Sequence, residues 1–204
     1  MNLSAFRTAS IAVVAIFATV LIAWQFGLLS PNGGGTGSIG NTKIGGPFEL
    51  FDQNGNRRND SDFRGRLMLI YFGYSYCPDV CPTALQIMSN ALKSLGNQAK
   101  SVQPIFITVD PKRDTSAHLR DYVKNFYPGM IGLTGTKDLI KDVAKKYRIY
   151  YAEAAQDKTI PDADDYLVDH SSIIFLMGRN GKYITHFNHQ TNAGIIAKII
   201  SKQL

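Results

Sequence analysis

Cysteine is nearly absent from this chain: only Cys77 and Cys81 occur among its 204 residues. No cysteine lies near the N-terminal apolar run, which excludes a lipoprotein anchor there. In an oxidising compartment, two such thiols are expected to be bonded to each other or to a metal ion. Basic and aromatic residues are not interleaved, and the net charge of +6 is spread along the chain. Nucleic acid is therefore not an expected partner, and no internal repeat is present.

Charge is also missing from residues 11–29, a long apolar run. Its length matches the roughly 20 residues that cross a hydrocarbon core as a helix. The run is longer than the apolar region of a cleaved secretory signal, and no Ala-x-Ala site follows it. The sequence therefore favours a retained transmembrane helix over a cleaved signal.

The orientation of this anchor is predicted from the basic residues beside it. Arg7 precedes the run, whereas residues 30–42 contain no lysine or arginine. The positive-inside rule places the N-terminus on the cytoplasmic or matrix side, and the rest in the periplasm or intermembrane space. Four segments are predicted: a short tail at 1–10, the anchor at 11–29, a flexible glycine-rich linker at 30–42 and one globular domain at 43–204.

Strands and helices are expected to alternate through the globular domain. Apolar runs predict strands at 46–50, 67–72, 104–109, 130–133, 171–177 and 182–187, while helical spacing predicts helices at 82–95, 192–201 and from about 115 and 136 onward. A brief helical turn is expected at 61–62, an extended stretch at 148–152 and a long acidic loop at 153–168. This order predicts a central mixed α/β sheet flanked by helices on both faces.

The two cysteines directly follow the apolar strand at 67–72, at a strand-to-helix junction. This position places the domain among thioredoxin-like folds, in which redox enzymes usually carry Cys-x-x-Cys. Here three residues separate the cysteines, and i, i+4 positions on a helix lie about 5–6 Å apart between Cβ atoms. That spacing suits two sulfurs converging on one ion, while a disulfide is also compatible with it. A redox pair and a soft-metal clamp both remain open.

A metal site needs a third ligand, and the chain offers four histidines. His118 falls on an amphipathic helix and is expected at the surface; His186 and His189 flank the end of the terminal hairpin and are expected to be solvent-exposed. His170 stands at the head of the strand at 171–177. In thioredoxin-like folds that entry packs against the cysteine loop, usually through a cis-proline. No proline is present here, so the imidazole of His170 is expected to point at the two sulfurs.

Four motifs in order closely resemble the Sco/SenC family of copper-binding assembly factors for cytochrome c oxidase. They occupy residues 71–82 (YFGYSYCPDVCP), 109–115 (VDPKRDT), 132–135 (GLTG) and 166–170 (YLVDH). The resemblance covers about residues 46–204, and the expected anchor matches the family's layout. It implies that Cys77, Cys81 and His170 bind copper, and that residues 109–115 shape a loop near the site.

The resemblance also implies partners: subunit II of cytochrome c oxidase, an upstream copper donor and the membrane. Two thiolates and one imidazole form a soft, low-coordinate set that suits Cu(I), and can hold Cu(II) with a further ligand. An alternative function is a thiol–disulfide oxidoreductase that uses Cys77 and Cys81 to reduce the cysteines of subunit II. A peroxiredoxin is rejected, because neither cysteine follows Pro-x-x-x-Thr-x-x. A sensor remains a minor alternative.

Overall fold

Two adjacent strands with no exposed residue form the centre of the sheet. They are β3 (Leu67–Gly73) and β4 (Val102–Thr108), which pair in parallel with every residue buried. The computed structural model describes Thr19, residues 43–154 and residues 166–204. The chain divides into two units, Met1–Thr42 and Lys43–Leu204, and the elements below belong to the second. Near-continuous apolar runs are typical of strands covered on both faces.

Seven strands form the main sheet, in the order β2-β1-β5-β4-β3-β8-β9. Strands β3, β4 and β5 are parallel, whereas the other neighbours pair antiparallel. The sheet is therefore mixed, as predicted. The strands outside the central pair are β1 (Glu49–Asp52), β2 (Arg57–Asn59), β5 (Ile131–Thr134), β8 (Ile173–Met177) and β9 (Tyr183–Asn188).

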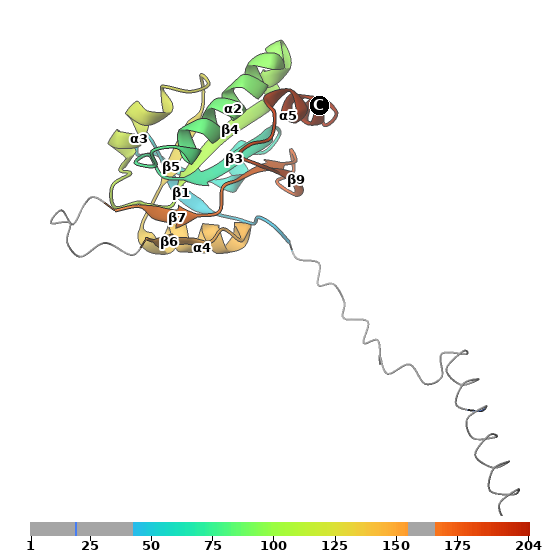
Figure 1. Cartoon of the computed structure of the whole chain (residues 1–204). Helices are drawn as coiled ribbons and strands as arrows, with labels where there is room; N and C mark the ends of the chain where they lie inside the picture. Colours follow the sequence, from blue (N-terminus) through green and yellow to red (C-terminus); the bar gives the residue numbers. More distant parts are fainter. Residues whose placement is uncertain (1–18, 20–42, 155–165) are drawn as a thin grey trace, which may run out of the picture. The chain divides into compact units, whose positions relative to one another are not determined.

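Helices cover both faces of this sheet, which confirms the predicted flanking helices. Figure 1 shows α2, α3 and α5 on one face and α4 on the other. Right-handed crossovers from β3 to β4 and from β4 to β5 place α2 and α3 on the same face. The helices are α2 (Val80–Ser94), α3 (Ser116–Val123), α4 (Lys137–Tyr147) and α5 (Ala193–Ser201), with short 3₁₀ turns at Asp60–Phe63 and Gly96–Ser101.

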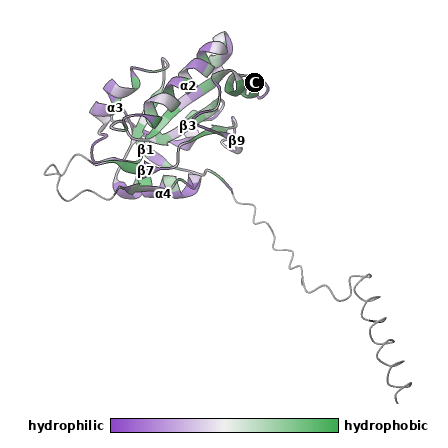
Figure 2. Ribbon diagram, in the orientation of Figure 1, coloured by the Kyte–Doolittle hydropathy of each residue, from purple (hydrophilic) through white to green (hydrophobic). Residues whose placement is uncertain are grey.

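Side-chain capping fixes three of the helix starts. The side chains of Thr115, Thr136 and Asn192 each accept a hydrogen bond from a backbone N–H in the first turn of α3, α4 and α5. Such caps satisfy donors that have no partner inside the helix. The starts expected near residues 115, 136 and 192 are thereby confirmed. Figure 2 shows hydrophobic residues gathered in the central strands and in α5, and hydrophilic residues along α2 and α3.

Several element boundaries differ from the sequence prediction. The strand expected at 46–50 begins at Glu49, and the unpredicted β2 pairs with it across a turn. The strand expected at 171–177 begins only at Ile173. Before it, β7 (Val168–His170) pairs with β6 (Tyr151–Glu153) as a separate two-stranded ribbon. Three-residue strands carry too little periodicity to be recognised from sequence.

The predicted anchor cannot be compared with these elements. None of the helices within the described part of the chain is long and apolar enough to cross a membrane. The expected anchor at 11–29 lies outside the described residues apart from Thr19. The tail at 1–10, the linker at 30–42 and positions 155–165 of the expected acidic loop also lie outside them.

Candidate metal centre

The cysteine pair lies where the central strand gives way to helix α2. Strand β3 ends at Gly73, and α2 begins only at Val80. Cys77 therefore belongs to the connecting loop, where its N–H donates to the Tyr74 carbonyl oxygen at 3.3 Å, and Cys81 belongs to the first helical turn. The predicted strand-to-helix junction is confirmed, but the helix begins at Val80, two residues before the predicted start. Asp79 is the N-cap residue and has non-helical backbone angles, which ends the loop after Cys77.

Both cysteines are reduced and buried, but their thiols differ. A hydrogen bond from Cys81 lowers the pKa of Cys77 to about 5 against the opposing effect of burial, with help from nearby backbone N–H groups and His170. Burial raises the pKa of Cys81 well above its ordinary range, and the neighbouring Cys77 raises it further. The surroundings thus favour the thiolate on Cys77 and the protonated thiol on Cys81.

His170 is brought to Cys81 from the other end of the domain. It is the last residue of β7, opposite Tyr151 of β6. Its Nδ1 lies 3.1 Å from the Val168 carbonyl oxygen, which can only accept, so Nδ1 carries the proton. Its Nε2 lies 3.3 Å from the sulfur of Cys81. The hydrogen bond at Nδ1 thereby leaves the Nε2 lone pair free and directed at the cysteines, as in metal-binding histidines.

A tyrosine hydroxyl lies between these two side chains. Tyr71 of β3 is fully buried, and its hydroxyl oxygen is 3.5 Å from Nε2 of His170 and 3.7 Å from the sulfur of Cys81. The same oxygen is 2.8 Å from Oγ of Ser172. Burial raises the pKa of Tyr71, and the Cys81 thiolate would raise it further, so the phenol keeps its proton. Sequence analysis missed Tyr71 and Ser172 because tyrosine in an apolar strand looks like core.

An arginine joins the three segments that carry the site. The guanidinium of Arg113 stacks 3.7 Å from the ring centre of Tyr166 and 4.7 Å from that of Tyr76. It forms an ion pair with Asp110, which also accepts a hydrogen bond from the Tyr166 hydroxyl at 2.8 Å. The loop at 109–115 is thus tied to the cysteine loop and to the segment before His170. Asp110 is engaged with Arg113 and Tyr166.

A second set of hydrogen bonds, centred on Asp114, anchors the cysteine loop. A carboxylate oxygen of Asp114 accepts from the Ser75 N–H at 3.0 Å and from the Thr108 hydroxyl at 2.6 Å. The Ser75 hydroxyl also bonds to Asp114 and lies 2.7 Å from Nε2 of His118. His118 stacks on Tyr76, with ring centres 5.0 Å apart. His118, expected at the surface, is therefore half-buried and supports the loop through Ser75 and Tyr76.

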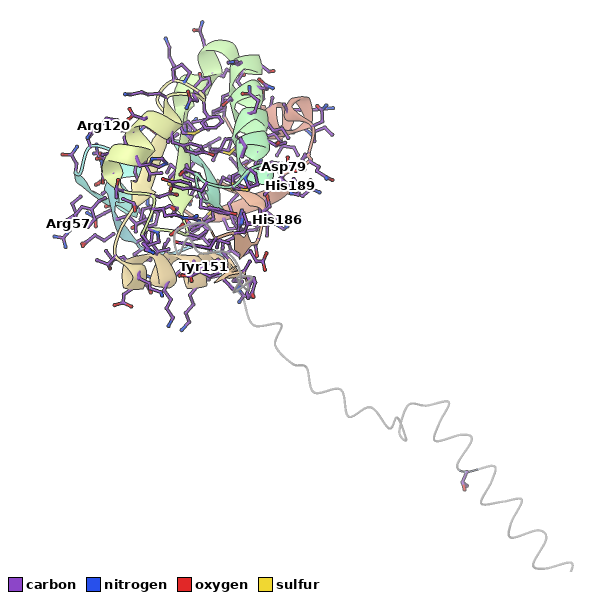
Figure 3. The ribbon with its side chains drawn as sticks, turned by 60° about the vertical axis from the view of Figure 1, so that its left-hand side comes forward. Arg57, Asp79, Arg120, Tyr151, His186 and His189 are labelled. Atoms are coloured by element: carbon purple, nitrogen blue, oxygen red, sulfur yellow. The ribbon has the colours of Figure 1, made fainter. Side chains whose placement is uncertain are left out.

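The remaining histidines lie on the terminal hairpin. His186 is exposed on β9 and bonds to Tyr183, whereas His189 is half-buried just after that strand. His189 is therefore less exposed than predicted. Figure 3 shows both on the same side of the molecule as Asp79.

The side chains of the three predicted ligands lie near one another, but they do not converge on a single metal position. Cys77 bonds to Cys81, and Cys81 contacts His170. Within residues 43–154 and 166–204, no three histidine, cysteine, aspartate or glutamate side chains are arranged to hold a metal ion as they stand. The donor set itself, two thiols and one imidazole with a free lone pair, fits a soft metal ion.

Comparison with known proteins adds independent information about the chain. A family model described as SCO1/SenC matches residues 36–204. A SCO2-like protein of Rickettsia prowazekii is 45% identical over 161 residues, which cover 79% of this chain and 77% of that protein. The solved structure of Bradyrhizobium japonicum ScoI with copper bound is 40% identical, with a TM-score of 0.71, and the match covers 79% of this chain and 99% of that one.

A more distant structure shares the fold alone. BsSco, described as a member of the Sco family of cytochrome c oxidase assembly proteins with a disulfide switch, is 23% identical, with a TM-score of 0.60. The match covers 79% of this chain and 93% of that one.

Proposed function

Because this chain belongs to the SCO1/SenC family, we propose that it binds copper through Cys77, Cys81 and His170 and delivers it during assembly of cytochrome c oxidase. The copper-bound relative supports the cargo, and membership of the SCO1/SenC family supports a role in assembly of cytochrome c oxidase. The observation that carries the ligand set is the 3.3 Å approach of His170 Nε2 to the sulfur of Cys81.

Copper is a transported substrate in this proposal, and three side chains are well suited to pass it on. Two sulfurs and one nitrogen leave an open coordination position, which an incoming thiolate or imidazole of the recipient can occupy. Each protein ligand can then be replaced in turn. Cys77 rotates toward the Cys81–His170 pair on loading, and the Nδ1 hydrogen bond to Val168 keeps the imidazole oriented throughout.

The recipient is proposed to be subunit II of the oxidase, loaded at its binuclear copper site. An upstream copper donor is proposed as the second partner. Residues 11–29 are proposed to tether the domain to the bacterial inner membrane or the mitochondrial inner membrane, with the N-terminus on the cytoplasmic or matrix side. The glycine-rich segment at 30–42 then gives the tethered domain lateral reach.

The ligand assignment is tested by copper titration of the full chain against its His170→Ala variant, in competition with a chromophoric chelator. We expect Cu(II) affinity to fall at least about 100-fold, the upper end of the loss seen when only an outer-shell partner of a metal ligand is removed. His186→Ala removes an exposed imidazole from β9 and serves as the matched control. Equal Cu(II) affinity of His170→Ala and the wild type would exclude His170 from the site.

A second function, thiol–disulfide exchange, is favoured by the unequal exposure of two reduced cysteines. Cys77 is 8% exposed and Cys81 is 0% exposed, so an incoming disulfide meets Cys77 first. The Cys77 thiolate attacks one sulfur of that disulfide and the other sulfur leaves as a thiolate. Cys81 passes its thiol proton to the thiolate released in the first step, and its sulfur then attacks Cys77, which releases the reduced target and leaves a Cys77–Cys81 disulfide. Two electrons pass to the target, and an external dithiol reductant must restore the pair.

The His170→Ala variant distinguishes copper delivery from thiol–disulfide exchange. Reduction of a subunit II disulfide should survive in His170→Ala, because no step of the exchange uses the imidazole, and it should be lost in Cys77→Ser. Copper retention should be lost in both variants. A wild-type chain that leaves the disulfide intact in the presence of dithiol reductant would exclude the reductase function and leave copper delivery as the sole one.

A further inference from the structure

The hydroxyl of Tyr71 has three potential hydrogen-bond partners but only one proton to donate. It lies 3.7 Å from the sulfur of Cys81, 3.5 Å from Nε2 of His170 and 2.8 Å from Oγ of Ser172. A phenol donates one hydrogen bond, while its oxygen can accept others. The tyrosine is fully buried in β3, so water cannot provide alternatives. Which neighbour receives the proton must depend on the state of the other groups.

In the metal-free chain, the hydroxyl already lies against both of these predicted ligands. The Nδ1 of His170 is engaged by the Val168 carbonyl oxygen, so its Nε2 faces the phenol and the Cys81 sulfur. Tyr71 donates toward the Cys81 sulfur, while its oxygen can accept from the Ser172 hydroxyl.

Metal binding strengthens the hydrogen bond to sulfur. A metal ion on Nε2 would occupy the lone pair of the imidazole, and a coordinating cysteine is held as its thiolate. The strongest acceptor within reach of the phenol is then the Cys81 sulfur, because hydrogen bonds to an ionised group are stronger than those to a neutral group. Ser172 can still donate to the phenol oxygen, which polarises the bond from Tyr71 to sulfur.

We propose that Tyr71 is a positioning residue of the copper site, whose hydroxyl donates a hydrogen bond to the coordinating sulfur of Cys81. This inference rests on the copper-binding function proposed above. A hydrogen bond to a coordinating thiolate draws electron density from the sulfur, which weakens its bond to Cu(II) more than its bond to Cu(I).

Tyr122 provides a matched control, because only the ring of Phe106 separates it from Tyr71. Its ring packs against Phe106, with ring centres 5.5 Å apart, and Phe106 in turn packs against Tyr71 at 6.5 Å. Its hydroxyl is buried and finds no hydrogen-bond partner among the described residues. Tyr122→Phe and Tyr71→Phe both remove one buried oxygen from the same face of the sheet. Only the second removes a hydrogen bond to the ligands.

The test uses the full chain and its Tyr71→Phe, Tyr122→Phe and Ser172→Ala variants, loaded with Cu(II) and separately with Cu(I). Affinities for both ions are measured by chelator competition, and the thiolate-to-Cu(II) charge-transfer absorption is recorded. In Tyr71→Phe we expect the ratio of Cu(II) to Cu(I) affinity to rise about 3- to 10-fold, the effect of losing one hydrogen bond. The charge-transfer band should move to longer wavelength, because an unbonded thiolate gives up its electron more readily.

Ser172→Ala should give a smaller shift in the same direction, and Tyr122→Phe should match the wild type. If Tyr71→Phe keeps the wild-type affinity ratio and band position, the proposal is overturned while copper binding stands. If it loses affinity for both ions equally, Tyr71 serves the fold alone and the proposal is likewise overturned. A wild-type chain without a thiolate charge-transfer band would overturn the copper-binding function and this inference with it.

Discussion

At the scale of single residues, Gly73 lets the sulfur of Cys81 lie directly against the sheet. A methyl group at Gly73 would stand 2.6 Å from that sulfur and 2.9 Å from a ring carbon of Tyr71. Both distances are shorter than van der Waals contact. Because Tyr71 is packed in a fully buried strand, the sulfur must be displaced if the methyl group is added. The absence of a side chain at position 73 is thus a requirement of the proposed metal site.

Gly73→Ala is therefore expected to weaken copper binding and to destabilise the fold by about 1–3 kcal/mol, the typical effect of overpacking a core. Chelator competition and urea unfolding measure the two effects. Gly46→Ala is the control, because its added methyl group would meet only a flexible lysine chain, at 3.5 Å. A Gly73→Ala variant with wild-type copper affinity would contradict this explanation, because it would show that the Cys81 sulfur can move without loss of copper binding.

At the scale of elements, the β1–β2 hairpin depends on the carboxylate of Asp52. One oxygen accepts from the N–H groups of Asn54 and Asn56, each at 2.9 Å, and the other accepts from Arg58 Nε at 2.9 Å. Burial by itself raises the pKa of this carboxyl, but the bonds from Asn56, Asn54 and Arg58 outweigh it and leave the pKa below the ordinary value. The folded state thus favours the ionised form.

A lowered pKa gives a stabilisation that is complete above the unfolded-state value, about 3.9, and is lost as the pH falls through the folded-state value. Asp52→Asn should therefore unfold about 1–2 kcal/mol more easily at pH 7, with a deficit that shrinks below about pH 4. Urea unfolding at pH 7 and pH 3 measures this difference. Asp121→Asn, at an exposed ion pair with Lys124, should change little at either pH. A deficit of equal size at both pH values would contradict the explanation by ionisation.

The ribbon of β6 and β7 is the element that carries His170, and Arg113 fastens it. The Arg113 guanidinium lies 3.7 Å above Tyr166, just before β7. Inside β7, the N–H of Val168 donates to the Tyr74 hydroxyl at 3.2 Å, and the Tyr74 ring packs edge-on against His170 at 5.6 Å. The position of the imidazole is thus set by the cysteine loop as well as by the ribbon.

Arg113→Lys keeps the charge beside Asp110 but replaces a flat, stacking guanidinium with a point charge. We expect a loss of about 1–2 kcal/mol in stability and faster amide hydrogen exchange at Val168 and His170. Arg120→Lys, on the exposed face of α3, is the matched control. Unchanged exchange at Val168 in Arg113→Lys would mean that the stacked rings do not hold the ribbon.

At the scale of the whole molecule, the proposed copper ion joins two parts of the chain that the sheet alone does not pair. Cys77 comes from the β3–α2 connection and Cys81 from the first turn of α2, whereas His170 ends a ribbon outside the seven-stranded sheet. A ligand that binds only the folded state stabilises it by mass action. Copper should therefore act as a cross-link between the sheet and the ribbon.

With free copper at about 100 times its dissociation constant, the folded state should gain about 2.7 kcal/mol, equivalent to a rise of about 5–10 °C in Tm. Differential scanning calorimetry of the wild type with and without Cu(I) measures this rise. His170→Ala should lose most of it, and His186→Ala should keep it. An equal rise in His170→Ala would assign the stabilisation to the cysteines alone.

The sequence determined the features that depend on neighbours along the chain. Buried strands at the centre, capped helices behind them and the placement of Cys77 and Cys81 at a strand-to-helix junction all follow from periodicity, capping residues and turn chemistry. The family motifs at 71–82 and 166–170 likewise pointed to the residues of the proposed site. The short β2 and β7 strands were missed, since three residues leave no readable pattern, and β6 was anticipated only as the extended stretch at 148–152 that overlaps it.

Only the tertiary structure decided which side chains meet. His170 reaches Cys81 across 89 residues of sequence, and Ser172 reaches Tyr71 across 101. Tyr71, Gly73 and Arg113 become parts of the site through those contacts, although each is an ordinary strand or loop residue in the sequence. Such contacts depend on the order of strands and on the direction of side chains across the sheet, which local preferences do not encode.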